Sequence, residues 1–227
     1  MDNQALMQDL PVAAEPIGKF ERIRAVSFLG YADAQPGDPL YESAKEVARV
    51  MAERDLVIIN GGGPGVMRAA TEGAHEGGGK AYIATFYPKH MENFEGKDPL
   101  NNADKEVVMN NYLDRTLKLL ELGNACVIFN GGTGTISEFG MAWGLARLYY
   151  GHHKPLILYG DFWYQIVEAF AAGMKLRPEE LRVYRIATTP EAALKAVWEY
   201  EQELKKGMHG TTIQPGAVDL EHAFMNG

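Results

Sequence analysis

The sequence predicts a single α/β domain with a doubly wound, mostly parallel, Rossmann-like sheet. Short apolar runs of strand length alternate with longer segments that carry apolar residues at helical spacing. The strand segments are almost continuously apolar, which is typical of strands covered by helices on both faces. No internal repeat is visible. We therefore expect one nucleotide-binding domain at 21–206, an N-terminal arm at 1–20 and a C-terminal tail at 207–227.

Each element follows from its local pattern. The first strand reads IRAVSFLG, and the first helix carries Ala44, Val47, Ala48 and Met51 on one face. A proline-containing loop at 87–103 separates the third and fourth strands. The expected strands are 23–30, 56–59, 80–86, 105–109, 125–129, 155–159 and 183–187. The expected helices are 41–54, 65–76, 111–122 (with Gly123 as C-cap), 134–149, 162–174 and 190–204.

Composition excludes several classes of protein. The net charge of −8, with no dense basic patch, disfavours a nucleic-acid partner. The lone Cys126 cannot form an intrachain disulfide. The beginning of the chain lacks the pattern of a signal peptide, and no apolar stretch approaches the roughly 20 residues of a membrane span. We expect a cytoplasmic protein without a membrane partner.

Two glycine-rich turns follow strands on the expected ligand edge. Ligands of parallel sheets bind outside the carboxyl ends of the strands, and residues 60–67 (NGGGPGVM) and 130–138 (NGGTGTISE) each lie between a strand and a helix. Glycine lets the backbone approach a ligand, and the free N–H groups of a following helix favour phosphate. The candidate substrate- and phosphate-binding residues are Gly61, Gly62, Gly63, Gly65, Met67, Gly131, Gly132, Thr133, Gly134 and Thr135.

The alternative interpretation is that both segments are tight turns in which glycine serves packing alone. One such cluster would leave the two interpretations about evenly balanced, whereas two clusters on one edge favour a ligand site. Neither cluster is a standard fingerprint. The chain lacks G-x-x-x-x-G-K-[ST], and its first strand ends in LGYAD rather than G-x-G-x-x-G. A P-loop NTPase and an ordinary NAD dehydrogenase are therefore disfavoured.

Glu138 and Arg115 are the candidate catalytic residues. Glu138 follows Gly134 by four residues and shares its helix face, about 5 Å along the axis from a phosphate at the helix start. This spacing suits a carboxylate that acts on a sugar attached to that phosphate. The alternative is a solvated first-turn glutamate. Arg115 could clamp a phosphate or hold a carboxylate, and its alternative is a surface ion pair with Asp114 or Glu121.

Together these segments resemble the Lonely Guy family of phosphoribohydrolases, whose members often carry the label lysine decarboxylase. The family pattern G-G-G-x-x-G-[LV]-M corresponds to 61–67 in a slightly compressed register, and P-G-G-x-G-T-x-x-E corresponds to 130–138. The similarity spans about 23–170. The sequence departs from the pattern at Asn130 (proline in the family), Ser137 (acidic) and Thr116 (lysine), and the last removes a cation from the expected phosphate site.

The resemblance implies hydrolysis of the N-glycosidic bond of a nucleoside 5′-monophosphate, of the AMP or cytokinin-riboside type, to free base and ribose 5-phosphate. It implies that Arg115 and Glu138 are catalytic, that the glycine motif holds the 5′-phosphate and that the protein is a homodimer or larger. We expect no cofactor and no metal ion, because the histidines show no metal-ligand spacing. His90 is a minor candidate for a substrate contact.

Two rivals remain open. A non-catalytic nucleotide or molybdenum-cofactor carrier could use the same glycine turns. A true amino-acid decarboxylase would need a Schiff-base lysine for pyridoxal phosphate. Lys80 begins a strand at the wrong edge, and Lys89 is the only lysine expected near the glycine turns.

Overall fold

The computed structural model describes residues 17–88, 96–151 and 153–206, which form an α/β fold around one parallel sheet. The seven-stranded sheet has the order β4-β3-β2-β1-β5-β6-β7, and every neighbouring pair is parallel. The expected fold class is confirmed. The strands are β1 (Ala25–Leu29), β2 (Val57–Asn60), β3 (Ala81–Phe86), β4 (Lys105–Met109), β5 (Ala125–Ile128), β6 (Leu156–Tyr159) and β7 (Tyr184–Ala187).

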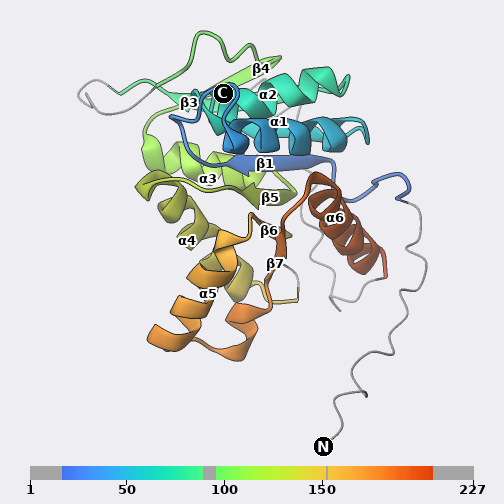
Figure 1. Cartoon of the computed structure of the whole chain (residues 1–227), viewed down its shortest axis with the longest axis vertical. Helices are drawn as coiled ribbons and strands as arrows, with labels where there is room; N and C mark the ends of the chain where they lie inside the picture. The colour runs from blue at the N-terminus through green and yellow to red at the C-terminus, as the bar shows by residue number, and fades with distance from the viewer. Residues whose placement is uncertain (1–16, 89–95, 152, 207–227) are drawn as a thin grey trace, which may run out of the picture.

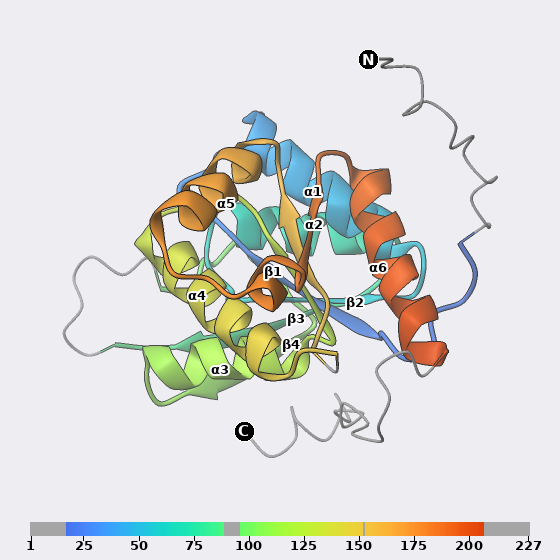
Figure 2. The same cartoon turned by 90° about the horizontal axis from the view of Figure 1, so that it is seen from below.

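Helices cover both faces of this sheet (Figures 1 and 2). One face carries α1 (Pro39–Ala52), α2 (Val66–Glu76) and α6 (Pro190–Lys205), whose apolar sides form one core with the sheet. The other face carries α3 (Tyr112–Leu122), α4 (Thr133–Leu148) and α5 (Phe162–Gly173), which enclose the second core. Two buried layers explain why the central strands are apolar on both sides.

The ends of the expected elements lie within about two residues of those observed. The short 3₁₀ helix Pro178–Leu181 was not expected. Gly123 is the C-cap of α3, as expected, but its backbone is extended rather than left-handed. Glycine is needed there because a Cβ would lie 2.2 Å from the Ser27 hydroxyl oxygen. Close packing, rather than a positive φ, selects glycine at this cap.

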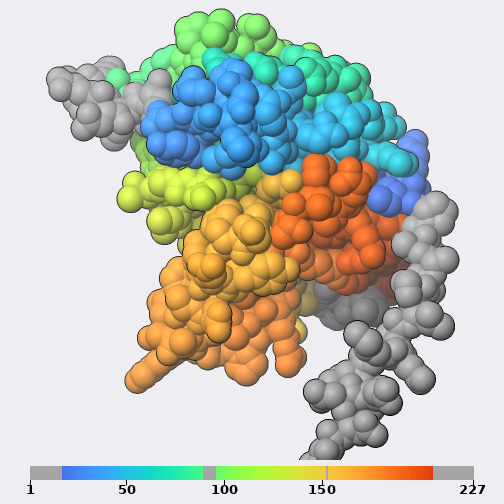
Figure 3. All heavy atoms as spheres, viewed as in Figure 1, coloured from blue at the N-terminus to red at the C-terminus, as the bar shows by residue number. Residues whose placement is uncertain are grey.

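Among the α-helices in the described part of the chain, α5 has the fewest buried residues. Among its residues, only Trp163 is fully enclosed, and the segment from α5 through the 3₁₀ helix projects from the body formed by α1 and α6 (Figure 3). Most of the expected arm at 1–20 and the whole tail at 207–227 lie outside the described residues.

Candidate active site

The site lies where the order of the sheet reverses. Strand β1 pairs with β2 on one side and with β5 on the other, so the connections leaving β1 and β5 diverge to opposite faces. Such a switch point leaves a crevice at the carboxyl ends of the strands. A cavity of about 420 Å³ occupies it, and this volume lies in the range of small-molecule sites, which runs from about 300 to 1,000 Å³.

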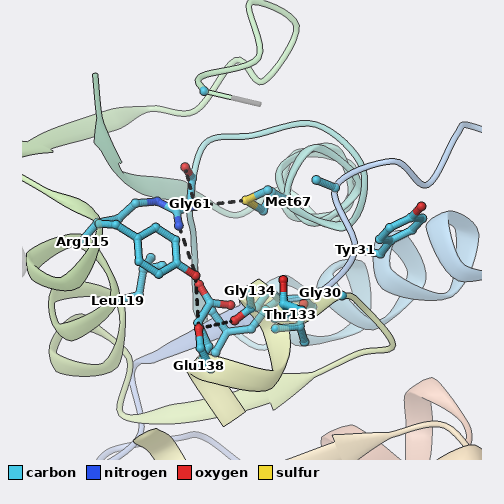
Figure 4. A pocket seen from close by; sticks show the side chains of 17 residues that line it. Gly30, Tyr31, Gly61, Met67, Arg115, Leu119, Thr133, Gly134 and Glu138 are labelled. Atoms are coloured by element: carbon cyan, nitrogen blue, oxygen red, sulfur yellow. Dashed lines mark hydrogen bonds and ion pairs between the residues drawn. The ribbon is translucent and has the colours of Figure 1, made fainter. Parts of the chain in front are cut away.

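The cavity brings together both candidate catalytic residues and most of the second glycine turn (Figure 4). From the expected set, its lining includes Gly61, Met67, Arg115, Gly132, Thr133, Gly134, Thr135 and Glu138. The lining does not include Gly62, Gly63, Gly65 or Gly131. The two glycine turns therefore differ in what they present to the cavity.

The second turn opens the N-terminus of α4 to the cavity. Gly132 is the N-cap and offers no side-chain acceptor, so the N–H groups of the first turn have no acceptor within the helix. The helix dipole adds partial positive charge at the same place. Gly131 has a packing role, because a Cβ there would lie 2.1 Å from the Thr135 hydroxyl oxygen. This end of the cavity is suited to an anion.

The carboxyl group of Glu138 is buried, with 6% of the residue exposed. The alternative of a solvated first-turn glutamate is therefore wrong. Burial raises the pKa of Glu138 to about 7, and the nearby Arg115 partly opposes this rise. A carboxyl group with such a pKa exchanges a proton readily near neutrality.

Arg115 points inward from α3 and faces Glu138, with 3.7 Å between Nη1 and Oε1. Its Nε donates to the Ala84 carbonyl at 3.2 Å, and its Nη2 donates to the Gly61 carbonyl at 3.1 Å. The guanidinium is thus buried and oriented by backbone carbonyls rather than paired with Asp114 or Glu121. This geometry favours the role of holding a carboxylate over that of clamping a phosphate.

Two backbone donors of the first turn already have acceptors within the protein. The Gly62 N–H donates to the Asn60 side chain at 2.8 Å, and the Val66 N–H donates to the Tyr31 carbonyl at 2.9 Å. Gly62 and Gly65 have positive φ angles of 73° and 64°, so glycine is required there by backbone conformation. These contacts leave the start of α2 less open to an anion than the start of α4.

Several lining residues were not singled out from the sequence. Tyr112 begins α3, and its hydroxyl lies 3.3 Å from the Ser137 hydroxyl. Leu119 lies one turn beyond Arg115 on the same helix and also lines the cavity. Tyr31 follows β1, but its side chain points away from the Arg115–Glu138 pair (Figure 4). The remaining residues of this kind are Phe28, Leu29, Gly30, Ala32 and Gly96.

The three departures from the family pattern have different surroundings. Thr116 is fully buried within the fold and does not line the cavity. Ser137 does line it, and its hydroxyl donates to the Gly134 carbonyl at 2.7 Å. The Asn130 carbonyl accepts a hydrogen bond from the Tyr31 backbone N–H at 3.0 Å. Lys89 and His90 lie outside the described residues.

The described residues contain neither a metal-binding cluster nor a membrane-spanning helix. In the ranges 17–88, 96–151 and 153–206, no three His, Cys, Asp or Glu side chains are grouped so that they could hold a metal ion. Within the same ranges, no helix has the length and apolar character needed to cross a membrane.

Fold and cavity together define a Rossmann-like protein with an open helix N-terminus and a buried arginine–glutamate pair. Residues 67–197 match the family described as "Possible lysine decarboxylase", and this match covers more than half of the chain. An uncharacterized protein of Archaeoglobus fulgidus is 30% identical over 121 residues, which are 53% of this chain and 75% of that protein. The chain therefore belongs to this family, and the resemblance to the Lonely Guy type is confirmed.

Solved structures share the fold. The protein TM1055 superposes with a TM-score of 0.60 at 24% identity, covering 78% of this chain and 99% of that one. A molybdenum cofactor binding protein of Rippkaea orientalis has a TM-score of 0.58 at 20% identity, covering 79% and 98%. A Moco carrier protein of Chlamydomonas reinhardtii has a TM-score of 0.55 at 22% identity, covering 82% and 99%. At these identities the likeness establishes the architecture alone.

Proposed function

We propose that this protein is a phosphoribohydrolase that hydrolyses the N-glycosidic bond of a nucleoside 5′-monophosphate. One observation carries the proposal: a buried glutamate with a pKa near 7 and an open helix N-terminus share one cavity. The phosphate would bind the N–H groups at the start of α4, supported by the Thr133 and Thr135 hydroxyls. The ribose would then lie beside Glu138, about one helical turn further along α4.

The chemistry follows from charge. Cleavage of the bond between ribose C1′ and the base nitrogen develops positive charge on the sugar, which an adjacent carboxylate stabilises. The Glu138 carboxylate accepts a proton from water, the water oxygen bonds to C1′, and the electron pair of the broken bond leaves with the base. The base nitrogen gains the proton that Glu138 took from water, so the products are free base and ribose 5-phosphate and Glu138 is ionised again. Arg115 orients Glu138 and favours its ionised form.

The direct test is product release from AMP and a panel of other nucleoside 5′-monophosphates, with free base and ribose 5-phosphate assayed together. Adenosine, which lacks the phosphate, is the matched substrate control. We expect release from at least one nucleotide, much slower release from its nucleoside, and loss of both in Glu138→Ala. Glu199→Gln, on the exposed face of α6, should retain full activity. Unchanged release in Glu138→Ala would exclude the proposed mechanism.

The carrier hypothesis is the second candidate, because two of the structural neighbours are described as molybdenum-cofactor binding or carrier proteins. Tight binding of a nucleotide or of molybdenum cofactor without turnover of any nucleotide would favour it. The buried Glu138 weighs against it, because a carboxyl group with a raised pKa is costly to keep in a site that only binds. A decarboxylase is less well supported, since no lysine is among the described residues that line the cavity.

We propose that the protein forms a homodimer through the helices beside the site. Helices α3 and α4 expose Leu113, Leu117, Ile136 and Leu148, each more than half accessible. We propose that these side chains form one apolar patch, because a contiguous exposed apolar patch marks an association surface. We expect a dimer by light scattering, and a monomer when Leu113 and Ile136 are both replaced by glutamate. A wild-type monomer would contradict the proposal.

A further inference from the structure

The guanidinium of Arg115 is held on the side away from Glu138 by the first glycine turn. Its Nη2 donates both to the Gly61 carbonyl at 3.1 Å and to the Met67 sulfur at 3.4 Å, while its Nη1 faces Glu138. Arg115 is 5% exposed, so solvent contributes little to its orientation. Figure 4 shows the arginine reaching from α3 across the cavity to Gly61 and Met67.

The glycines at 61 and 63 are explained by the side chains that pack against them. A Cβ on Gly61 would lie 1.6 Å from Arg115 Nη2 and 2.8 Å from the Met67 sulfur. A Cβ on Gly63 would lie 2.4 Å from the Met67 methyl carbon. Neither glycine has a positive φ, so backbone conformation does not demand glycine at these positions. Space for Arg115 and Met67 does.

The acceptors of this turn suit a cation. Carbonyl oxygen and thioether sulfur accept hydrogen bonds without carrying a formal charge. They fix the guanidinium without neutralising its positive charge, and its Nη1 faces Glu138. An anion bound in the first turn would compete with Glu138 for the charge of Arg115. The anion site proposed above lies instead at the start of α4, the helix that carries Glu138.

We propose that the first glycine turn is the seat of the Arg115 guanidinium, and that Gly61 and Met67 are positioning residues that hold it against Glu138. The catalytic consequence rests on the proposed function, whereas the geometry does not. The two glycine turns then have different roles. The turn before α4 binds the phosphate, and the turn before α2 holds the charged Arg115 guanidinium beside Glu138 and the sugar.

The sharpest perturbation is Gly61→Ala. Because the φ angle of Gly61 is not positive, the added methyl group displaces the flexible tip of Arg115 rather than the backbone. Arg115 on α3 and Cys126 on β5 both interact electrostatically with Glu138, and of the two Arg115 is charged. The thiol of Cys126 on β5 is neutral, because burial raises its pKa to about 11. Displacing Arg115 therefore raises the pKa of Glu138.

The experiment is a titration of the Glu138 carboxyl carbon by ¹³C NMR in the ligand-free protein, paired with the pH profile of kcat/KM for nucleotide hydrolysis. Removing an opposite charge at this distance shifts a carboxyl pKa by roughly one unit. We expect that rise in Gly61→Ala, with the acid limb of the profile moved equally. At pH 7 the ionised fraction, and with it kcat/KM, would fall about five-fold.

Three further variants separate positioning from a merely structural effect. Met67→Leu removes the sulfur acceptor and should shift the titration in the same direction by a smaller amount. Met67→Gln restores an acceptor and should return it toward wild type. In an Arg115→Met background, Gly61→Ala should cause no further shift. Gly173→Ala, where a Cβ meets nothing within 4 Å, is the matched control and should titrate as wild type.

The outcomes are distinguishable. A folded Gly61→Ala protein with an unchanged Glu138 titration overturns the positioning role, whatever the protein hydrolyses. The expected titration shift in a protein that releases no base supports the positioning role and overturns the proposed hydrolysis. If Gly61→Ala does not fold, the same titration of Met67→Leu and Met67→Gln tests the positioning role. Glu138 titrations unchanged in both variants overturn it.

Discussion

The carboxyl group of Glu138 links the chemistry of the site to the stability of the fold. Burial raises its pKa from 4.5 to about 7, so the native state binds this proton more tightly than the unfolded chain does. A group of this kind contributes its full stability below the unfolded pKa. That contribution is lost as the pH rises through the folded pKa. For Glu138 the window of loss runs between about pH 4.5 and pH 7.

Replacement of Glu138 by glutamine removes this titration while preserving the shape of the side chain. The rise from 4.5 to about 7, at about 1.4 kcal/mol for each unit, means that the ionised carboxylate costs the native state roughly 3 kcal/mol well above pH 7. We expect Glu138→Gln to be more stable than wild type at pH 8.5 and closer to it at pH 5. For a chain of this length the gain at pH 8.5 corresponds to a rise in Tm of roughly 6–12 °C.

The assay is thermal unfolding followed by circular dichroism at pH 5 and pH 8.5, with activity measured on the same samples. Glu199→Gln controls for the loss of an exposed carboxylate. A gain in stability at high pH together with lost hydrolysis would be a trade-off between stability and activity at the site. Equal stability differences at both pH values, or a less stable variant at pH 8.5, would refute the argument that Glu138 is a desolvated carboxyl group.

Three other predictions concern groups that hold the fold around the site. Glu201, fully buried on α6, accepts backbone N–H groups of residues 21–23 at 2.8–3.1 Å; Glu201→Gln should cost roughly 3 kcal/mol in urea unfolding, and a loss comparable to that of Glu199→Gln would contradict this anchoring role. Lys154 donates hydrogen bonds to three carbonyls at the end of α3 at 2.7–2.8 Å. Lys154→Met should therefore lower the free energy of unfolding by roughly 2 kcal/mol, and unchanged urea unfolding would contradict this expectation. Gly65→Ala places a Cβ 2.3 Å from the Tyr31 carbonyl at a φ of 64°; it should lower Tm by several degrees, whereas an unshifted melting curve would show that the turn can relax.

The order of the elements could be predicted from the sequence because it depends on local patterns. Apolar runs of strand length and helical spacing placed the strands and helices to within about two residues. Glu138 was expected beside the second glycine turn because it follows Gly134 by four residues, about one turn of helix. The turn itself was expected at the ligand edge because it follows the carboxyl end of a strand. These relations involve neighbours in the chain.

The pairing of Arg115 with Glu138 was decided by tertiary structure. The two residues lie on different helices, and only the adjacency of β1, β2 and β5 in the sheet brings α3 and α4 to one cavity. Burial of both side chains follows from the same packing. The raised pKa of Glu138 depends on that burial, which composition and spacing do not encode.

The two glycine turns show the same division. By sequence alone they look equivalent, because each is a glycine cluster between a strand and a helix. In three dimensions the turn before α4 leaves its N–H groups open to the cavity, whereas the turn before α2 makes room for Arg115 and Met67. Sequence determined that both backbones could approach something closely. Which partner each one approaches depends on side chains from distant parts of the chain, and only the folded packing supplies them.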